Sequence, residues 1–284
     1  MKLATFTAGA APELGAVTER GLVPLTRGTA LPTDMTGLIA RWPELESEVR
    51  RLAEAAGDLL GLDQARLLAP IDRPGKIMAI GLNYADHIAE SGLPKPENQV
   101  WFCKQPSSVN GPFDPVQIPK VADTVDYEVE LVAVIGARRR HISRAEAPKA
   151  VFGYCVGNDV SERTWQRQTP QWVLGKSFDT HAPFGPWITT ADEFGDPHGH
   201  AIRCLVNGEL RQNSNTDQLV FDVWAQVEHL SKAMTLEPGD LIFTGTPGGV
   251  GAAMKPPRFL KPGDRVRCEI DGLGAIEAVC EAEV

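Results

Sequence analysis

The hydrophobic and polar positions of residues 126–136 form the most informative pattern in the chain, because alternating acidic residues lead directly into an apolar run. In a β-strand, alternate side chains share a face, so Glu128 and Glu130 point the same way and Val129 points the other way. The run 131–135 is rich in β-branched residues, which predicts a strand buried on both faces. The two glutamates are therefore predicted at the mouth of a hydrophobic core.

Two carboxylates at such a place require a counter-charge. Close, partly desolvated carboxylates repel each other and resist ionisation unless a cation compensates them. A donor set made only of oxygen atoms suits Mg²⁺, Mn²⁺ or Ca²⁺ better than zinc. The competing interpretation is a solvated acidic strand end, which is the commoner origin of an isolated Glu-x-Glu.

A second apolar strand ends at a third acidic residue. Residues 151–158 predict a buried strand, Asp159 follows it, and a helix is predicted soon afterwards with Ser161 near its N-cap. Three carboxylates at strand ends describe a Mg²⁺ site that keeps positions for water or substrate. Capping or turn formation is the alternative role of Asp159, because Asn-Asp is ordinary turn chemistry.

A short helix follows the predicted strand 76–81. It spans residues 83–92, with Gly92 and the prolines after it as its stop. His87 and Glu90 are three residues apart and share one face, so the carboxylate can orient the imidazole as a general base. The alternative is a surface pair on an exposed helix, although the flanking Gly and Pro residues also suit a mobile lid.

Two lysines and a glycine-rich segment complete the candidate chemistry. Lys176 is a candidate cation for a developing oxyanion, with a surface lysine as the alternative. Lys104 ends a predicted strand and faces either a site or solvent. The segment 244–251 follows another strand and can offer backbone N–H groups, but it lacks the Gly-Lys-Ser/Thr ending of a phosphate loop.

The rest of the pattern predicts a small N-terminal domain, residues 1–73, ahead of a larger catalytic domain, residues 74–284. Short extended pieces precede one amphipathic helix, 42–56, which Gly57 ends. The C-terminal third is rich in strands. Its expected elements are a hairpin turning at Asn207-Gly208, a helix at 221–233, and two Pro-Gly-Asp turns, 238–240 and 262–264, that each lead into a strand.

Composition narrows the possible partners. A net charge of -9 over 284 residues argues against a nucleic-acid binder, whose surface should be basic. No signal-peptide pattern and no apolar stretch of bilayer-spanning length is found, so we expect a cytoplasmic protein without a membrane partner. The five cysteines form no Cys-x-x-Cys pair, which supports neither a disulfide framework nor a thiolate metal site.

Taken together and in order, these segments resemble the fumarylacetoacetate hydrolase family, in its short bacterial branch that includes acylpyruvate hydrolases. The resemblance covers the chain from about Lys76 to the C-terminus, through Gly-Leu-Asn-Tyr-Ala-Asp-His, Tyr-Glu-Val-Glu-Leu, Gly-Asn-Asp-Val-Ser, Gly-Lys-Ser-Phe-Asp and Thr-Gly-Thr-Pro-Gly-Gly-Val-Gly. It implies an α+β fold, with a mixed, mostly antiparallel sheet rolled into a barrel-like core, and a homodimer.

The resemblance also implies roles for nine residues. Mg²⁺ or Mn²⁺, with Ca²⁺ as a possible substitute, is expected on Glu128, Glu130 and Asp159. The expected catalytic residues are His87, Glu90 and Lys176. The expected substrate-binding residues are Arg163, Gln166 and Thr246. Asp126 shares the face of Glu128, but the family pattern does not require it and we leave it out of the predicted site.

The implied activity is hydrolytic carbon–carbon cleavage of a β-diketo acid such as an acylpyruvate, a small anionic keto acid. His87 would deprotonate water for attack on the distal carbonyl, and pyruvate would leave as its enolate, stabilised by the metal and Lys176. Oxaloacetate decarboxylation and isomerisation of a hydroxymuconate-type diacid use the same metal–enolate chemistry and remain alternatives. A metal-dependent keto-acid binder is the non-enzymatic alternative.

Overall fold

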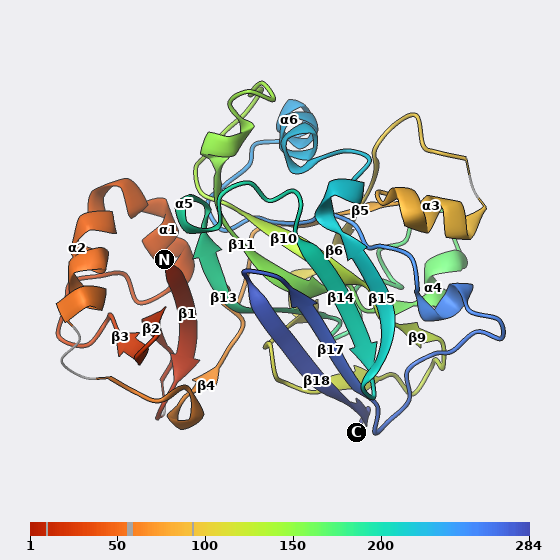
Figure 1. Cartoon of the computed structure of the whole chain (residues 1–284), viewed down its shortest axis with the longest axis horizontal. Coiled ribbons are helices and arrows are strands. Elements are labelled where there is room, and N and C mark those ends of the chain that lie inside the picture. Colours follow the sequence, from red (N-terminus) through yellow and green to blue (C-terminus); the bar gives the residue numbers. More distant parts are fainter. Residues whose placement is uncertain (10, 56–58, 93) are drawn as a thin grey trace.

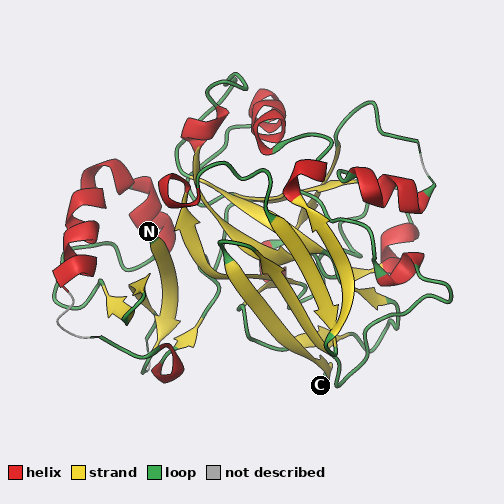
Figure 2. Cartoon of the chain, in the orientation of Figure 1, coloured by secondary structure: helices red, strands yellow, loops and turns green. Residues whose placement is uncertain are grey.

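The computed structural model of the protein describes residues 1–9, 11–55, 59–92 and 94–284 and has a mixed α+β fold built on two larger sheets (Figures 1 and 2). The larger sheet has eleven strands, nine of them in the order β3-β2-β1-β13-β11-β10-β16-β5-β6, with β4 beside β1 and β7 beside β13. Its strands are β1 Lys2–Thr7, β2 Glu13–Thr18, β3 Gly21–Pro24, β4 Arg66–Leu67, β5 Ile77–Gly81, β6 Val100–Lys104, β7 Val109–Asn110, β10 Val129–Ile135, β11 Val151–Asn158, β13 Ala182–Thr190 and β16 Leu241–Phe243.

A second sheet of five strands has the order β15-β14-β17-β18-β8, and β9 and β12 form a separate pair. These strands are β8 Val116–Ile118, β9 Val125–Asp126, β12 Ser161–Glu162, β14 Ala201–Val206, β15 Glu209–Asn215, β17 Arg265–Ile270 and β18 Gly274–Ala282. Pairing is antiparallel except between β16 and β5, β13 and β7, and β18 and β8. The hairpin predicted at Asn207-Gly208 is confirmed as β14–β15.

Strand β10 lies at the centre of the core and is buried along its whole length, as its sequence predicts. Leu131 and Ala133 belong to a hydrophobic cluster shared with β14 and β17 of the second sheet. Val132 and Val134 point the other way, into a cluster that includes Leu3 of the N-terminal region. Because its side chains alternate between two faces, β10 packs into both hydrophobic clusters and connects them.

The described strands do not form a closed barrel. The pairing of the large sheet runs from β3 at one edge to β6 at the other, and no described strand joins those two edges. The barrel-like core that the resemblance implies is therefore not confirmed, and one face of β10 packs against β14 and β17 of the second sheet.

The helices lie around the sheets (Figure 1). They are α1 Met35–Ala40, α2 Trp42–Ala55, α3 Ala85–Ser91, α4 Arg163–Arg167, α5 Ala191–Phe194 and α6 Val223–Ala233. The predicted end of the 42–56 helix at Gly57 falls outside the described residues. Helix α3 ends at Gly92, whose φ of 67° is left-handed, as predicted.

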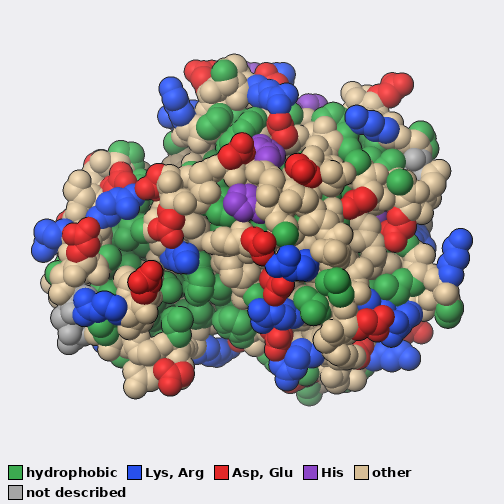
Figure 3. Space-filling view, in the orientation of Figure 1, with side chains coloured by type: hydrophobic (Ala, Val, Ile, Leu, Met, Phe, Trp, Pro, Cys, Tyr) green, Lys and Arg blue, Asp and Glu red, His purple; other side chains and the backbone are tan. Residues whose placement is uncertain are grey.

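The N-terminal elements sit together on the left of Figure 1 and are joined to the large sheet by β1. Strand β1 pairs with β13, with Lys2 opposite Thr189. The division at residue 73 stays a prediction. No helix in the described ranges has the length and apolar character needed to cross a membrane. Acidic and basic side chains are interspersed over the face drawn in Figure 3.

Candidate active site and metal centre

Antiparallel pairing of β10 with β11 brings the three predicted carboxylates together. Val129 at the start of β10 pairs with Asn158 at the end of β11. The backbone N–H of Asp159 donates to the carbonyl of Glu128 over 2.8 Å. As a result, Glu128, Glu130 and Asp159 each place an oxygen within 4.8 Å of the others, and all three side chains are buried.

Two buried lysines neutralise part of this acidic cluster. Lys176 Nζ lies 2.7 Å from Glu128 and 2.6 Å from Asp159, and Lys104 Nζ lies 2.6 Å from the other oxygen of Asp159. Burial lowers the pKa of Lys176, but the charges of Asp159 and Glu128 outweigh burial and raise that pKa overall. Lys176 is thus held as an ammonium ion. Lys104, which the sequence left unassigned, belongs to the cluster.

Glu130 is the uncompensated member of the three. Within the described part of the chain it forms no ion pair with lysine or arginine, and its carboxylate accepts a backbone hydrogen bond from Gly245, 2.8 Å away. Burial, then the charges of Asp159 and Glu128, raise its pKa well above the usual range. A buried carboxylate that lacks a counter-charge, within a set of oxygen donors, fits a hard divalent cation.

Arg163 is fixed by protein carboxylates at the side of the cavity. Its guanidinium lies 2.8 Å from Asp126 and 2.6 Å from Glu128, and it donates to Gln166 over 3.0 Å. Burial raises the pKa of the Glu128 carboxyl, but Lys176 and Arg163 outweigh burial and hold that pKa well below its usual range.

Asp126, omitted from the predicted site, is completely buried and organises the cavity wall. Besides Arg163, its oxygens accept backbone hydrogen bonds from Gly251 at 2.8 Å and Ala252 at 2.9 Å. The acid therefore connects the arginine of α4 to the segment that follows the glycine-rich loop. Its position on the same alternating face as Glu128 was the available sequence signal.

The glycine-rich loop carries Thr246 and contacts helix α3. The Thr246 hydroxyl donates to the Val129 carbonyl over 3.0 Å, which anchors the loop to β10. The Gly249 N–H donates to Glu90 over 3.0 Å, while the His87 Nδ1 to Glu90 distance is 3.4 Å. His87 and Glu90 therefore lie within reach of each other, and the Glu90 carboxylate also accepts a hydrogen bond from the glycine-rich loop.

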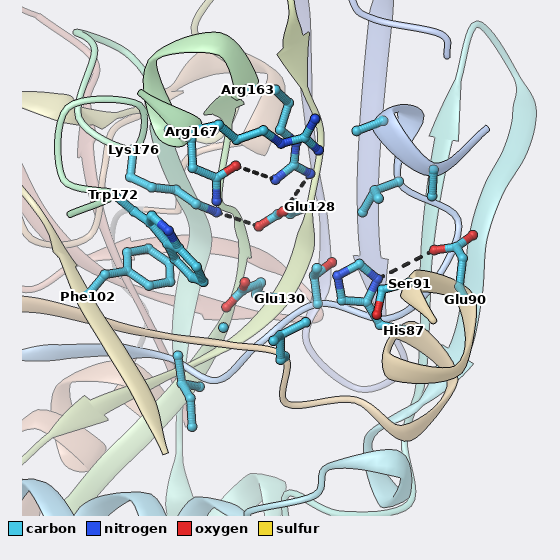
Figure 4. Close-up of a pocket in the computed structure, with 18 residues that line it drawn as sticks. His87, Glu90, Ser91, Phe102, Glu128, Glu130, Arg163, Arg167, Trp172 and Lys176 are labelled. Atoms are coloured by element: carbon cyan, nitrogen blue, oxygen red, sulfur yellow. Dashed lines mark hydrogen bonds and ion pairs between the residues drawn. The ribbon is translucent and has the colours of Figure 1, made fainter. Parts of the chain in front are cut away.

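These groups border one cavity of about 430 Å³ (Figure 4), a size typical of small-ligand sites. Eight of the nine predicted residues line it. The ninth, Asp159, does not line the cavity and is bound to Lys176. The lining residues that were not predicted include a cation, Arg167, and two aromatic residues, Phe102 and Trp172. Alternation in β6 places Phe102 on the same face as Lys104, and this signal could have identified both.

Comparison with known proteins identifies the family. Residues 76–280 match the family model described as fumarylacetoacetate (FAA) hydrolase C-terminal. The chain belongs to the fumarylacetoacetate hydrolase family. Within it, the chain is 51% identical over 220 residues to the mitochondrial oxaloacetate tautomerase fahd2 of Xenopus laevis, covering 77% of this chain and 69% of that protein.

Solved structures of the fumarylacetoacetate hydrolase family share the fold along the whole chain. A fumarylacetoacetate hydrolase of Exiguobacterium antarcticum is 36% identical with a TM-score of 0.90, and coverage of both chains is 100%. A maleylpyruvate hydrolase of Sphingobium sp. SYK-6, in complex with manganese(II) and pyruvate, is 34% identical with a TM-score of 0.85 and the same coverage. Family membership thus identifies the protein as an enzyme of the fumarylacetoacetate hydrolase family. The reaction differs among its relatives, which are named as a tautomerase and as hydrolases.

Proposed function

We propose that this protein is a divalent-metal-dependent enzyme that interconverts the enol and keto forms of a small 2-oxo acid, with oxaloacetate as the first substrate to test. The observation that carries the proposal is a buried ammonium, Lys176, beside three buried carboxylates in a ligand-sized cavity. The name of the Xenopus laevis relative supports the choice of reaction.

Mg²⁺ or Mn²⁺ would be held by Glu128, Glu130 and Asp159, and would supply Lewis-acid stabilisation of negative charge on the substrate's oxygen. Lys176 contributes a fixed positive charge at the same end of the cavity. Enolate formation places more negative charge on oxygen than the ketone carries, so this ammonium stabilises the transition state more than the ground state.

Tautomerisation also moves one proton between carbon and oxygen, and we assign its transfer to His87. Figure 4 shows His87 and Lys176 on opposite sides of Glu128 and Glu130, which separates the proton-transfer group from the ammonium. Glu90, 3.4 Å from the imidazole, orients the ring. Three residues that line the cavity remain the proposed substrate contacts: Arg163, Gln166 and Thr246.

Hydrolysis of an acylpyruvate is the second candidate, favoured by the His87–Glu90 pair at the cavity. In this reaction, His87 accepts a proton from water, the hydroxide adds to the distal carbonyl, and the carbon–carbon bond breaks to give a carboxylic acid and the pyruvate enolate. A proton then converts the enolate to pyruvate. The Sphingobium relative, a hydrolase in complex with manganese(II) and pyruvate, is in keeping with this candidate.

One experiment separates the candidates. Metal-stripped protein receives oxaloacetate enol or a short acylpyruvate, each with and without Mg²⁺ or Mn²⁺, and products are identified by mass. Metal-dependent loss of the enol absorbance at unchanged mass supports the tautomerase. Pyruvate plus a free acid from the acylpyruvate alone would replace it with the hydrolase, and carbon dioxide from oxaloacetate would replace it with a decarboxylase.

His87→Gln and Lys176→Met test the assigned roles. Both variants should lose most turnover, while Mn²⁺ binding to the His87→Gln protein should be unchanged because His87 is not among the three carboxylates. A fully active His87→Gln protein would contradict its assignment to proton transfer.

A further inference from the structure

Arg167 is a cavity-lining cation outside the machinery assigned above. It is the last residue of α4 and lies four residues after Arg163, so both arginines project from the same face of the helix. Its side chain is exposed, and it borders the same cavity as the acidic cluster. Figure 4 shows it on the side of the cavity that also carries Arg163 and Lys176.

The other two Lys and Arg side chains of the cavity are occupied by protein carboxylates. Lys176 lies within 2.7 Å of two acids, and Arg163 lies within 2.8 Å of two acids. Both are buried. Over the described residues, by contrast, no carboxylate lies within ion-pair distance of Arg167. Its charge is therefore available to a ligand.

We propose that Arg167 binds the distal carboxylate of the substrate, so that the site selects 2-oxo dicarboxylates over 2-oxo monocarboxylates. The inference rests on the proposed function, because it assumes that the 2-oxo acid end of the substrate faces Glu128, Glu130 and Asp159. It adds the residue that recognises the second carboxylate and the discrimination against monocarboxylates that this residue produces.

The arrangement suits this task for two reasons. A guanidinium donates two parallel hydrogen bonds to a carboxylate, which fixes direction as well as charge. The neighbouring wall is formed by Phe102 and Trp172, whose ring centres are 5.5 Å apart, and this apolar surface excludes water from the substrate's middle carbons. The exposed position of Arg167 then places the second carboxylate at the cavity mouth.

Equilibrium binding tests the inference without turnover. Mn²⁺-loaded protein is titrated with 2-oxoglutarate and with 2-oxopentanoate, in which a methyl group replaces the distal carboxylate. Arg167→Gln should weaken binding of 2-oxoglutarate about ten- to a hundredfold, the range for a charge-assisted hydrogen-bonded pair, and change binding of 2-oxopentanoate less than about twofold. Arg167→Lys should retain part of the preference, since it keeps the charge and loses the bidentate geometry.

Arg51→Gln is the matched control, because Arg51 is an exposed arginine of α2 that does not line the cavity. It should change neither affinity. An Arg167→Gln protein that loses affinity for both ligands equally, or for neither, would overturn the inference.

Turnover separates this inference from the proposed function. Oxaloacetate and its 4-ethyl ester, which lacks the distal charge, are compared as enol substrates. Turnover of both without an Arg167-dependent preference in kcat/KM refutes the role of Arg167 and leaves the tautomerase intact. An Arg167-dependent preference in binding with no turnover of either substrate supports the inference and rejects the tautomerase. If neither keto acid binds the Mn²⁺-loaded protein, both the role of Arg167 and the proposed function are wrong.

Discussion

Glu130 is the side chain on which the proposed metal dependence rests most directly. Its carboxylate is buried without an ion-pair partner among the described residues, and its pKa is raised by burial and by its acidic neighbours. A charge held under these conditions destabilises the metal-free protein. The same charge becomes favourable when a divalent cation is present.

We therefore predict that Glu130→Gln abolishes stabilisation by Mn²⁺. At a metal concentration about one hundred times the Kd, the wild-type unfolding free energy should rise by about 2.7 kcal/mol, or about 5 °C in Tm, and the variant should not respond. With chelator present, the variant should be at least as stable as the wild type, because it removes an acid whose ionised form is repelled by its neighbours and opposed by burial. Thermal unfolding measures both effects.

Glu48→Gln, which neutralises an exposed acid of α2, is the control and should keep the full metal response. Equal stabilisation of Glu130→Gln and wild type by Mn²⁺ would place the metal elsewhere.

Asp126 is predicted to position Arg163 and the loop at 251–252. Asp126→Asn keeps the size of the side chain, but it leaves Arg163 with one fewer charge partner and turns an N–H group toward backbone donors. We expect about 3 kcal/mol lower unfolding free energy, the usual loss on breaking a buried ion pair, and kcat/KM reduced about tenfold or more. Urea unfolding and steady-state kinetics measure the two effects.

Asp271→Asn offers a matched comparison, because Asp271 pairs with Arg203 on the surface. The unfolding free energy of that variant should change by less than about 1 kcal/mol. A kcat/KM for Asp126→Asn within twofold of wild type would show that Arg163 keeps its place without this acid.

At the residue scale, the sequence predicted the acidic residues whose positions follow from local strand patterns. Glu128 and Glu130 were predicted because they share a strand face, and Asp159 because it ends an apolar run. Alternation in β6 gives the face of Lys104, but its ion pair was not predictable, since the partner, Asp159, is 55 residues away in sequence and comes within 2.6 Å only in the fold. Asp126 was predicted on the same strand face as Glu128, but its role in the cavity wall depends on a backbone donor, Gly251, that is 125 residues away in sequence.

At the element scale, helix α3 is held against the glycine-rich loop by its acidic residues. Asp86 accepts a hydrogen bond from the Gly248 N–H at 3.2 Å and another from the Ser214 hydroxyl of β15, and Glu90 accepts one from Gly249. The helix that carries His87 is thus fastened at two points to the wall of the cavity.

Asp86→Ala should loosen this helix. We predict about tenfold faster hydrogen exchange of the 85–91 amides and a higher KM, because His87 is held less firmly over the substrate. Amides of α6 serve as the internal reference and should exchange at unchanged rates. Unaltered exchange in α3 would mean that Glu90 and helix packing suffice to hold it.

Elements were predictable where the signal is local. The left-handed Gly92 ends α3 as expected, and the apolar run gives β10. Ser161 lies near the cap of α4, as predicted, but the cap itself is its neighbour: Glu162 accepts the Trp165 N–H at 2.7 Å, while Ser161 donates to the Asp159 carbonyl. Both residue types occur near helix starts, and the short β9–β12 pairing decides which one takes the position.

At the scale of the whole molecule, His181 connects the two larger sheets. It immediately precedes β13 of the large sheet, and its Nε2 lies 2.9 Å from the Gln117 carbonyl of β8 in the five-stranded sheet. Burial lowers the pKa of His181 to about 3. Between about pH 6.5 and pH 3, the imidazole is therefore neutral in the folded protein, whereas the same histidine is protonated in the unfolded chain.

This difference predicts acid sensitivity. As the pH falls below about 6.5, the unfolded chain binds a proton that the folded protein excludes until about pH 3, so stability falls through this window. Between pH 6.5 and 5, the wild type should lose about 2 kcal/mol more than His181→Gln, which keeps a donor for Gln117. Urea unfolding across this range measures it, and parallel pH profiles for both proteins would contradict the assignment.

The arrangement of the whole molecule was the least predictable level. The mixed α+β class was implied by the resemblance to the family, but the packing of β10 against the second sheet depends on contacts with strands about 70 or more residues later. The homodimer implied by the family stays a prediction, which light scattering can check. The cytoplasmic location also stays a prediction, since the frog relative is named as mitochondrial.

Lys104 and Lys176 have a consequence for how the protein matures. They already pair with two of the three carboxylates, so we expect the chain to reach its native state before any ion is bound. Structural zinc modules differ, because they are unfolded until they are loaded. Metal loading of this protein would then be a reversible exchange with the free divalent pool after synthesis, and occupancy would follow the supply of Mg²⁺ or Mn²⁺ in the compartment where it works.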